Sequence, residues 1–231
     1  MTLTLEPDVR DGLQQARPRS LLIDTDRHRR LIGWIGVLLP FILPVSAMLR
    51  PTKDLSPLLH SLSAYYYTSS IAVLEGTLVA LALFLVAYRG YPNKYQWVDE
   101  WAARVAGTAA LVIALFPTYP PENVPNPPWW TEMFGKIHDW ASVVMFVMFA
   151  LFSLWLFRKT DQSKQDLSRG KRRRNQLYFF CGITIVGSML FAAYRLKTGS
   201  TQIFVPETLA IVAFSVSWLV KGGAARRLMP D

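Results

Sequence analysis

The sequence predicts an all-α fold, a polytopic membrane bundle of about six transmembrane helices with both termini in the cytoplasm. Three observations lead to this fold class. Apolar residues make up 52% of the chain and the mean hydropathy is +0.22, although a soluble chain of 231 residues needs polar cover on its exposed faces. The apolar residues gather in long runs, and the basic residues gather between those runs.

Six apolar runs cover residues 31–49, 67–88, 98–116, 138–157, 177–194 and 203–220. Each has roughly the 17 to 22 residues that an α-helix needs to cross about 30 Å of hydrocarbon. Helices are expected because lipid gives backbone groups no hydrogen-bond partners, and the period-2 pattern of a membrane barrel is absent. We therefore predict a polar cytoplasmic tail at 1–30, a transmembrane domain at 31–223 and a short cytoplasmic C-terminal tail at 224–231.

The distribution of charge predicts the orientation. The chain has 25 Lys and Arg against 16 Asp and Glu, which gives a net charge of +9. Nineteen of the basic residues fall in tails or connections that a six-helix topology assigns to the cytoplasm, and five fall on the opposite side. This asymmetry indicates a multi-pass protein of the bacterial inner membrane and no nucleic-acid partner. One basic run is expected to contact anionic lipid: Lys171, Arg172, Arg173 and Arg174.

Two connections on the predicted outer side are long. In residues 50–66, the pair Ser56-Pro57 favours the start of a short helix, because serine caps a helix and proline fits its first turn. Residues 117–137 begin with six prolines in twelve residues. That density excludes regular helix and favours stiff, extended backbone on the outer surface.

The third predicted helix has the marks of a packing element. Ala102, Ala106 and Ala110 recur every four positions, a spacing that lets helices approach closely. Glu100 and Arg104 stand four residues apart and are expected to form a structural ion pair.

Ionisable residues inside lipid are the most informative, because burying them is costly unless they are paired. Glu75 lies about eight residues into the second predicted helix, and so roughly 12 Å below its outer end. Its neighbours in sequence offer no charge partner. It is either a functional carboxyl or a protonated or hydrogen-bonded group that fixes helix packing.

The remaining candidates also map to the outer half. His138 and Asp139 open the fourth predicted helix, and Ser142 follows one turn after His138 on the same face. Glu207 lies near the outer start of the sixth helix, and His60 is the only other histidine on that side. Each has an ordinary alternative, either a helix N-terminus that favours a carboxylate or an exposed loop histidine.

These residues predict a polar pocket on the outer side, in which Glu75, His138 and Glu207 converge. The leading interpretation is a membrane protein without an assigned reaction, whose pocket binds a lipid, an amphiphile or a cation. One alternative is a lipid hydrolase or transferase in which His138 or Glu75 is the general base, directly or through a metal-bound water. Another is a small proton-coupled transporter in which Glu75 titrates.

No motif fixes a reaction. The sequence has no Gly-x-Ser-x-Gly, no Walker loop, no His-Glu-x-x-His and no Gly-x-Gly-x-x-Gly. The single cysteine, Cys181, excludes an internal disulfide and a Cys-x-x-Cys zinc pair. The sequence predicts no dedicated metal site and identifies no cofactor. The expected partners are membrane lipids, together with a second copy of the chain or another membrane protein.

Five stretches carry a resemblance: Leu62–Thr68, Ala87–Tyr91, Ala114–Thr118, Ile137–Asp139 and Phe214–Gly222. They resemble a family of uncharacterised bacterial six-helix membrane proteins, from about residue 31 to residue 223. The resemblance implies the six-helix architecture and no activity.

A second comparison is with the ceramidase-like membrane hydrolases, whose pattern includes Ser and His in early helices and a His-x-x-x-His pair in the last. Ser61 or Ser63 with His60 is similar to the first part. The last predicted helix, 203–220, contains no histidine, and a three-histidine zinc site would need His28 from the opposite side. The sequence therefore departs from that family at the metal-binding positions.

Overall fold

A computed structural model describes residues 19–53, 55–90, 95–122, 124–159 and 168–225, with side chains from residue 25 onward. Within these ranges the chain forms six α-helices: α2 (Arg19–Leu49), α3 (Ile71–Val86), α4 (Gln96–Leu115), α5 (Glu132–Leu154), α6 (Arg169–Lys197) and α7 (Phe204–Lys221). Two short 3-10 helices join them, η1 (Ser63–Tyr67) and η2 (Leu156–Arg158). The prediction of an all-α chain with six helices is confirmed.

Four segments are long and apolar enough to cross a membrane: Thr25–Leu49, Glu132–Arg158, Arg169–Lys197 and Phe204–Lys221. α3 is apolar but shorter, and α4 carries Asp99, Glu100 and Arg104 in its first half. Several long apolar helices in one chain are typical of a multi-pass membrane protein.

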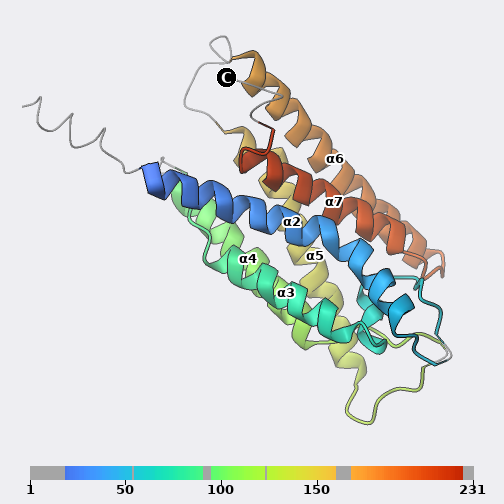
Figure 1. Cartoon of the computed structure of the whole chain (residues 1–231). Coiled ribbons are helices and arrows are strands. Elements are labelled where there is room, and N and C mark those ends of the chain that lie inside the picture. The colour runs from blue at the N-terminus through green and yellow to red at the C-terminus, as the bar shows by residue number, and fades with distance from the viewer. Residues whose placement is uncertain (1–18, 54, 91–94, 123, 160–167, 226–231) are drawn as a thin grey trace, which may run out of the picture.

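The helices form an up-and-down bundle (Figure 1). Each helix packs against the next in sequence, and α7 packs back against α2, which closes the ring. The start of α2 and the end of α7 therefore lie at the same end of the bundle, together with η2 (Figure 1). We call this the η2 end. The opposite end, with η1, the start of α5 and the α6–α7 turn, is the η1 end.

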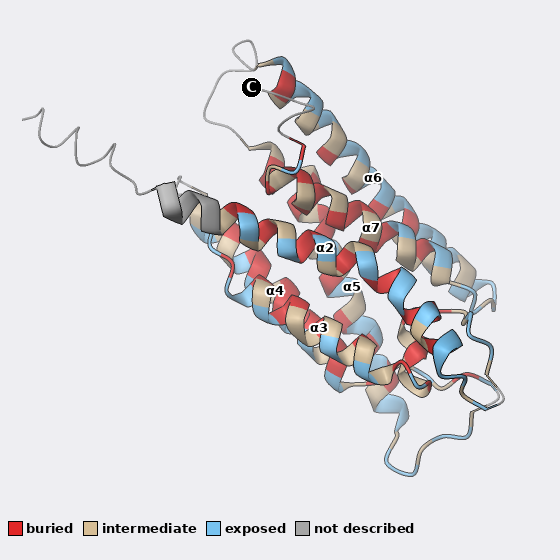
Figure 2. Cartoon of the chain, in the orientation of Figure 1, coloured by how far each residue is buried: buried red, intermediate tan, exposed pale blue. Residues whose placement is uncertain are grey.

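Buried and exposed residues alternate along the helices (Figure 2). Small and aromatic residues are among the buried ones, and large apolar side chains are also exposed, which is the pattern expected for a bundle in lipid. Ala102, Ala106 and Ala110 of α4 are all fully buried, so the predicted packing face is confirmed. Large apolar side chains on the outer surface include Trp140, which is 71% exposed. Such exposure is natural against acyl chains and unusual against water.

The inner core is aromatic toward the η2 end. The rings of Phe149 and Phe214 stack with centroids 3.4 Å apart, and Trp218 is fully buried beside Phe152 and Tyr88. This cluster joins α5 and α7 to the end of α3.

Part of the segment predicted to form the N-terminal tail is helical. α2 begins at Arg19, so residues 19–30 continue the helix. Arg29 is only 1% exposed, because its guanidinium pairs with Asp26 at 3.2 Å and donates to the Tyr88 hydroxyl at 3.4 Å. A charge at this position is buried with partners instead of marking the end of a solvated tail.

Two other helix starts also differ from the prediction. α5 begins at Glu132, so His138 and Asp139 lie well inside the helix rather than at its opening. α3 begins at Ile71, and at 1.5 Å per residue Glu75 lies about 6 Å from its start instead of the expected 12 Å. The chain before Ile71 is used in η1 and its turn, which shortens the apolar helix.

The long connections at the η1 end are held by side-chain hydrogen bonds. No helix begins at Ser56, whose hydroxyl only accepts from Leu58 N at 3.2 Å in a local turn. The described residues of the proline-rich connection up to residue 131 are non-helical, as predicted, whereas residues 132–137 belong to α5. Its Thr118 carbonyl accepts from the Tyr67 hydroxyl at 2.6 Å and from Trp130 Nε1 at 3.2 Å, which ties it to η1.

The basic run expected to contact anionic lipid lies in the first turns of α6 at the η2 end. The helix begins before this run because Ser168 caps it, accepting from Lys171 N at 3.1 Å. The ion pair expected in α4 is confirmed, with Arg104 and Glu100 3.1 Å apart. Contact of the basic run with lipid stays a prediction.

Candidate functional site

A cavity whose lining includes several polar side chains lies at the η1 end, among α5, α6, α7 and the connection that leads into η1. Its volume is about 390 Å³. Four of the predicted candidates line it: His138, Asp139, Ser142 and Glu207. Four further hydroxyl side chains line it as well: Ser61, Ser63, Thr118 and Ser188.

His138 is 4% exposed and is held by two hydrogen bonds. Its Nδ1 lies 2.7 Å from the Phe116 carbonyl oxygen, and its Nε2 lies 2.9 Å from Ser63 Oγ. A carbonyl can only accept, so the hydrogen of the neutral ring is on Nδ1. Nε2 then accepts from the Ser63 hydroxyl. The end of α4 thereby fixes the tautomer of a histidine on α5.

Glu207 anchors the connection before η1 to the start of α7. Its two carboxylate oxygens accept from Ser61 Oγ at 3.1 and 2.9 Å, and Oε2 also accepts from Leu62 N at 2.6 Å. Ser61 Oγ in turn accepts from Ser63 N at 3.1 Å. Charge-assisted bonds of this kind are short and directional. Glu207 therefore sets the position of Ser63 through Ser61.

The cavity is polar at one end and apolar at its mouth. Val143 of α5 and Leu190 and Leu196 of α6 line it while remaining 46%, 68% and 54% exposed. These side chains belong both to the cavity and to the outer surface of apolar helices. The mouth therefore opens between α5 and α6 toward the region that lipid occupies.

A family model described as "Protein of unknown function (DUF998)" matches residues 29–225. The chain belongs to this family. DUF998 is a membrane protein family of unknown function, so the resemblance seen in the sequence is confirmed. The match begins within α2 and ends after α7, and it contains every residue that lines the cavity. Searches of curated proteins and of solved structures found no match.

Two of the predicted site residues, Glu75 and His60, do not line the cavity at the η1 end. Glu75 does not line it, and within the described ranges its carboxylate has no hydrogen-bond or ion-pair partner. The negative charge of Glu75 instead raises the pKa of Tyr66, after the larger effect of burial. Of the three residues predicted to converge, His138 and Glu207 therefore line one cavity, and Glu75 does not.

His60 contributes its backbone rather than its ring. Its carbonyl accepts from Ile203 N at 2.8 Å and from Phe204 N at 2.6 Å, which ties the first outer connection to the start of α7. Burial lowers the pKa of the His60 imidazole, and the charge of Glu122 partly offsets that effect. The ring does not line the cavity.

Sequence reasoning did not select Ser63 as a site residue. It entered only through the ceramidase-like comparison, in which His60 was its partner. The structure pairs Ser63 with His138 instead, 75 positions away. Serines in loops are too common for one of them to indicate a functional site. The sequence around Ser63 shows only that it lies near other polar residues and before three tyrosines.

The acidic and histidine side chains in the described ranges do not form a metal-ligating cluster. No group of three or more His, Cys, Asp or Glu with suitable spacing occurs in the parts of the chain that the structure describes. The Glu207 oxygens bond the η1 connection, and both His138 nitrogens are engaged. The cavity thus offers hydrogen-bonding groups around an oriented imidazole.

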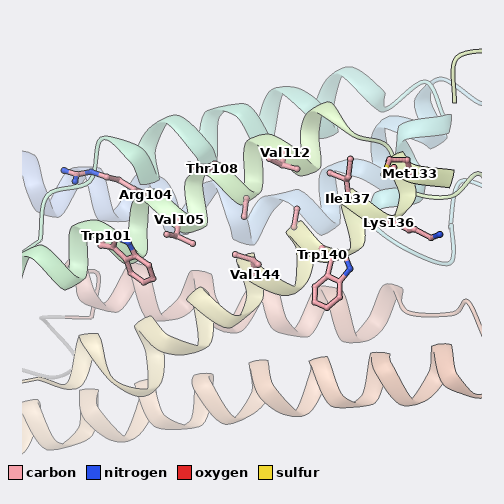
Figure 3. Close-up of a pocket in the computed structure, with 12 residues that line it drawn as sticks. Trp101, Arg104, Val105, Thr108, Val112, Met133, Lys136, Ile137, Trp140 and Val144 are labelled. Atoms are coloured by element: carbon pink, nitrogen blue, oxygen red, sulfur yellow. The ribbon is translucent and has the colours of Figure 1, made fainter. Parts of the chain in front are cut away.

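A second hollow lies on the outer surface between α4 and α5, with a volume of about 690 Å³ (Figure 3). Trp101 and Trp140 project along it, and most other lining residues are apolar. Its two cations are paired within their own helices, Arg104 with Glu100 at 3.1 Å and Lys136 with Glu132 at 2.7 Å. None of the predicted pocket residues lines this groove.

Proposed function

We propose that this DUF998 protein binds an amphiphile in the cavity at the η1 end. The observation that carries the proposal is the gradient inside one cavity, from the buried His138 to an apolar mouth of exposed α5 and α6 side chains. A head group can hydrogen-bond at the polar end while its chain leaves between the two helices into the membrane. The apolar side chains at this mouth would make no favourable contact with a free cation.

The size and lining of the cavity fit this occupant. Ligand sites in proteins usually have about 300–1,000 Å³, mostly apolar walls and a few placed polar groups. The cavity of about 390 Å³ has this composition, and its polar lining includes the exposed Asp139 together with Ser142 and Ser188. A head group with hydroxyl or carbonyl groups can pair with these donors and acceptors.

We further propose that the η1 end faces the outside of a bacterial inner membrane. The basic residues at the described helix ends of the η2 end, among them Arg158, Lys171 and Lys221, support this orientation. Reporter fusions after Arg158 and after Asp231 are expected to report the cytoplasm. A periplasmic signal from the fusion at Asp231 would reverse the assignment.

Amphiphile binding is testable with the whole chain purified in a mild detergent. Native mass spectrometry of the wild type is expected to show a retained lipid. Ala193→Trp places a large ring at an exposed position of the cavity lining and is expected to remove most of that lipid. Gly187→Trp is the matched control, because it adds the same ring to the same helix where a Cβ meets nothing within 4 Å.

Two results would contradict amphiphile binding. One is a wild-type chain that retains no lipid in detergent or after exchange into lipid nanodiscs. The other is equal retention by the two tryptophan variants, since only Ala193 lines the cavity.

A further inference from the structure

The pair Ser63 and His138 has the arrangement of a nucleophile and its base. Ser63 Oγ lies 2.9 Å from His138 Nε2, and His138 Nδ1 is fixed by the Phe116 carbonyl at 2.7 Å. An activated hydroxyl in proteins needs a hydrogen-bonded base, and that base needs a third group to hold its orientation. All three parts are present, with a main-chain carbonyl in the place that a carboxylate often takes.

The pair is also accessible from the cavity. Both residues line it, and Ser63 is only half-buried although His138 is enclosed. The link from Glu207 through Ser61 holds the Ser63 backbone. The hydroxyl is thus a positioned group at the border of a space that an amphiphile can enter, rather than a hydroxyl sealed between helices.

We propose that Ser63 is the nucleophile and His138 the general base of an acyl-transfer reaction on a lipid ester. This inference rests on amphiphile binding in the cavity, because the scissile carbonyl must lie at its polar end. The acyl chain would follow the apolar mouth, where Leu190 and Leu196 are exposed. Glu207 is a positioning residue that holds the connection carrying Ser63.

The reaction begins when Ser63 Oγ attacks the carbonyl carbon and passes its proton to His138 Nε2. An Oγ–C bond forms, and the carbonyl π electrons move to oxygen. When the carbonyl re-forms, the bond to the alcohol breaks, and the leaving oxygen takes the proton from Nε2. Water, the second substrate, then attacks the acyl-serine. It gives one proton through Nε2 to Ser63 Oγ and releases a carboxylic acid.

The charges around the pair favour a carboxylic ester over a phosphodiester. Asp139 and Glu207, two acidic side chains, are among the residues that line the cavity. A phosphodiester would bring a full negative charge against them in the ground state, whereas a carboxylic ester is neutral. The described lining of the cavity contains no Lys or Arg to compensate such a charge.

The test uses a hexadecyl fluorophosphonate, whose fluoride an activated serine displaces, and p-nitrophenyl decanoate as the ester. The full chain in lipid nanodiscs is expected to be labelled at Ser63, as mapped by peptide mass spectrometry, and to release nitrophenol. Ser63→Ala should abolish both signals. His138→Gln should lower both rates by about 100-fold or more. Ser56→Ala, an exposed serine of the same connection, is the control and should match the wild type.

Folding and lipid retention are measured on every variant, so that a collapsed bundle is not mistaken for a lost nucleophile. If the wild type retains lipid but neither labels Ser63 nor cleaves the ester, acyl transfer is refuted and amphiphile binding stands. Labelling that persists in Ser63→Ala refutes Ser63 as the nucleophile. If the wild type retains no lipid and reacts with neither probe, both proposals fall.

Discussion

Removal of the Glu207 carboxylate is the most informative test of how the cavity is held together. Glu207→Ala deletes a group that accepts from both the Ser61 hydroxyl and Leu62 N. Leu62 is only 3% exposed, so its N–H would be left without this partner in a place that water reaches poorly. Glu207→Gln keeps one carbonyl oxygen for Leu62 N, and its amide can still donate to Ser61 Oγ.

The magnitude follows from these bonds. An unpaired buried donor costs about 1–3 kcal/mol, and hydrogen bonds to a charged group contribute about 1.5–3 kcal/mol each without adding fully. We expect Glu207→Ala to lower the free energy of unfolding by about 2–4 kcal/mol. For a chain of this size, at about 2–4 °C per kcal/mol, that corresponds to a decrease of roughly 4–16 °C in the unfolding midpoint. Glu207→Gln should lose about half as much.

The assay is thermal unfolding in detergent, followed by tryptophan fluorescence. Glu132→Ala is the matched control, because it also removes a carboxylate near the η1 end, but from a surface pair with Lys136. Exposed pairs contribute little, so this control should unfold with the wild type. Equal midpoints for Glu207→Ala and Glu132→Ala would show that Glu207 does not anchor the η1 connection.

Three other predictions concern Gly107, His60 and Glu75. Gly107→Ala adds a methyl 2.8 Å from the Ala82 carbonyl oxygen and should destabilise the bundle by about 1–3 kcal/mol. Gly76→Ala, which meets nothing within 4 Å, should be neutral or slightly stabilising, and equal thermal midpoints for the two variants would contradict the close α3–α4 contact. Burial lowers the pKa of the His60 imidazole in the folded chain below its ordinary value of 6.5. As the pH falls, the imidazole therefore binds a proton in the unfolded chain at a higher pH than in the folded chain. Stability should therefore decrease as pH falls below about 6.5. His60→Gln should make the stability less dependent on pH. If the pH profile of the unfolding midpoint is the same for this variant and the wild type, His60 is not the group responsible. Glu75→Gln should unfold like the wild type between pH 5 and 8, whereas a large loss would reveal a cation paired with Glu75.

The helices could be predicted because lipid imposes a strong demand on sequence. A run that must cross hydrocarbon has to be long and apolar, and its backbone has to be helical. The starts of α2 and α5 could not be predicted in the same way. Residues such as Arg29 and Glu132 are polar, and whether they continue a helix depends on partners such as Tyr88 that lie far away in sequence.

The site was partly predictable for a related reason. Depth along a helix follows from counting residues, and it correctly placed His138 and Glu207 at the same end. Direction around the helix axis needs an amphipathic pattern, and α3 is apolar on all sides, so nothing indicated where Glu75 points. Ser63 depends on the path of an irregular connection, which is set by its bonds to Glu207 and His138 and has no periodic signal.

The closure of the ring by α7 has a consequence for biosynthesis. The ribosome makes α7 after α2 to α6, yet this helix contacts α2 and supplies Glu207 to a connection made much earlier. Until α7 enters the membrane, the Ser61 hydroxyl and Leu62 N lack their carboxylate, and the cavity lacks one wall. A nascent chain that stalls before α7 would lack the contacts of α7 with α2 and α6 and the hydrogen bonds that Glu207 accepts, so the bundle would stay open between α2 and α6.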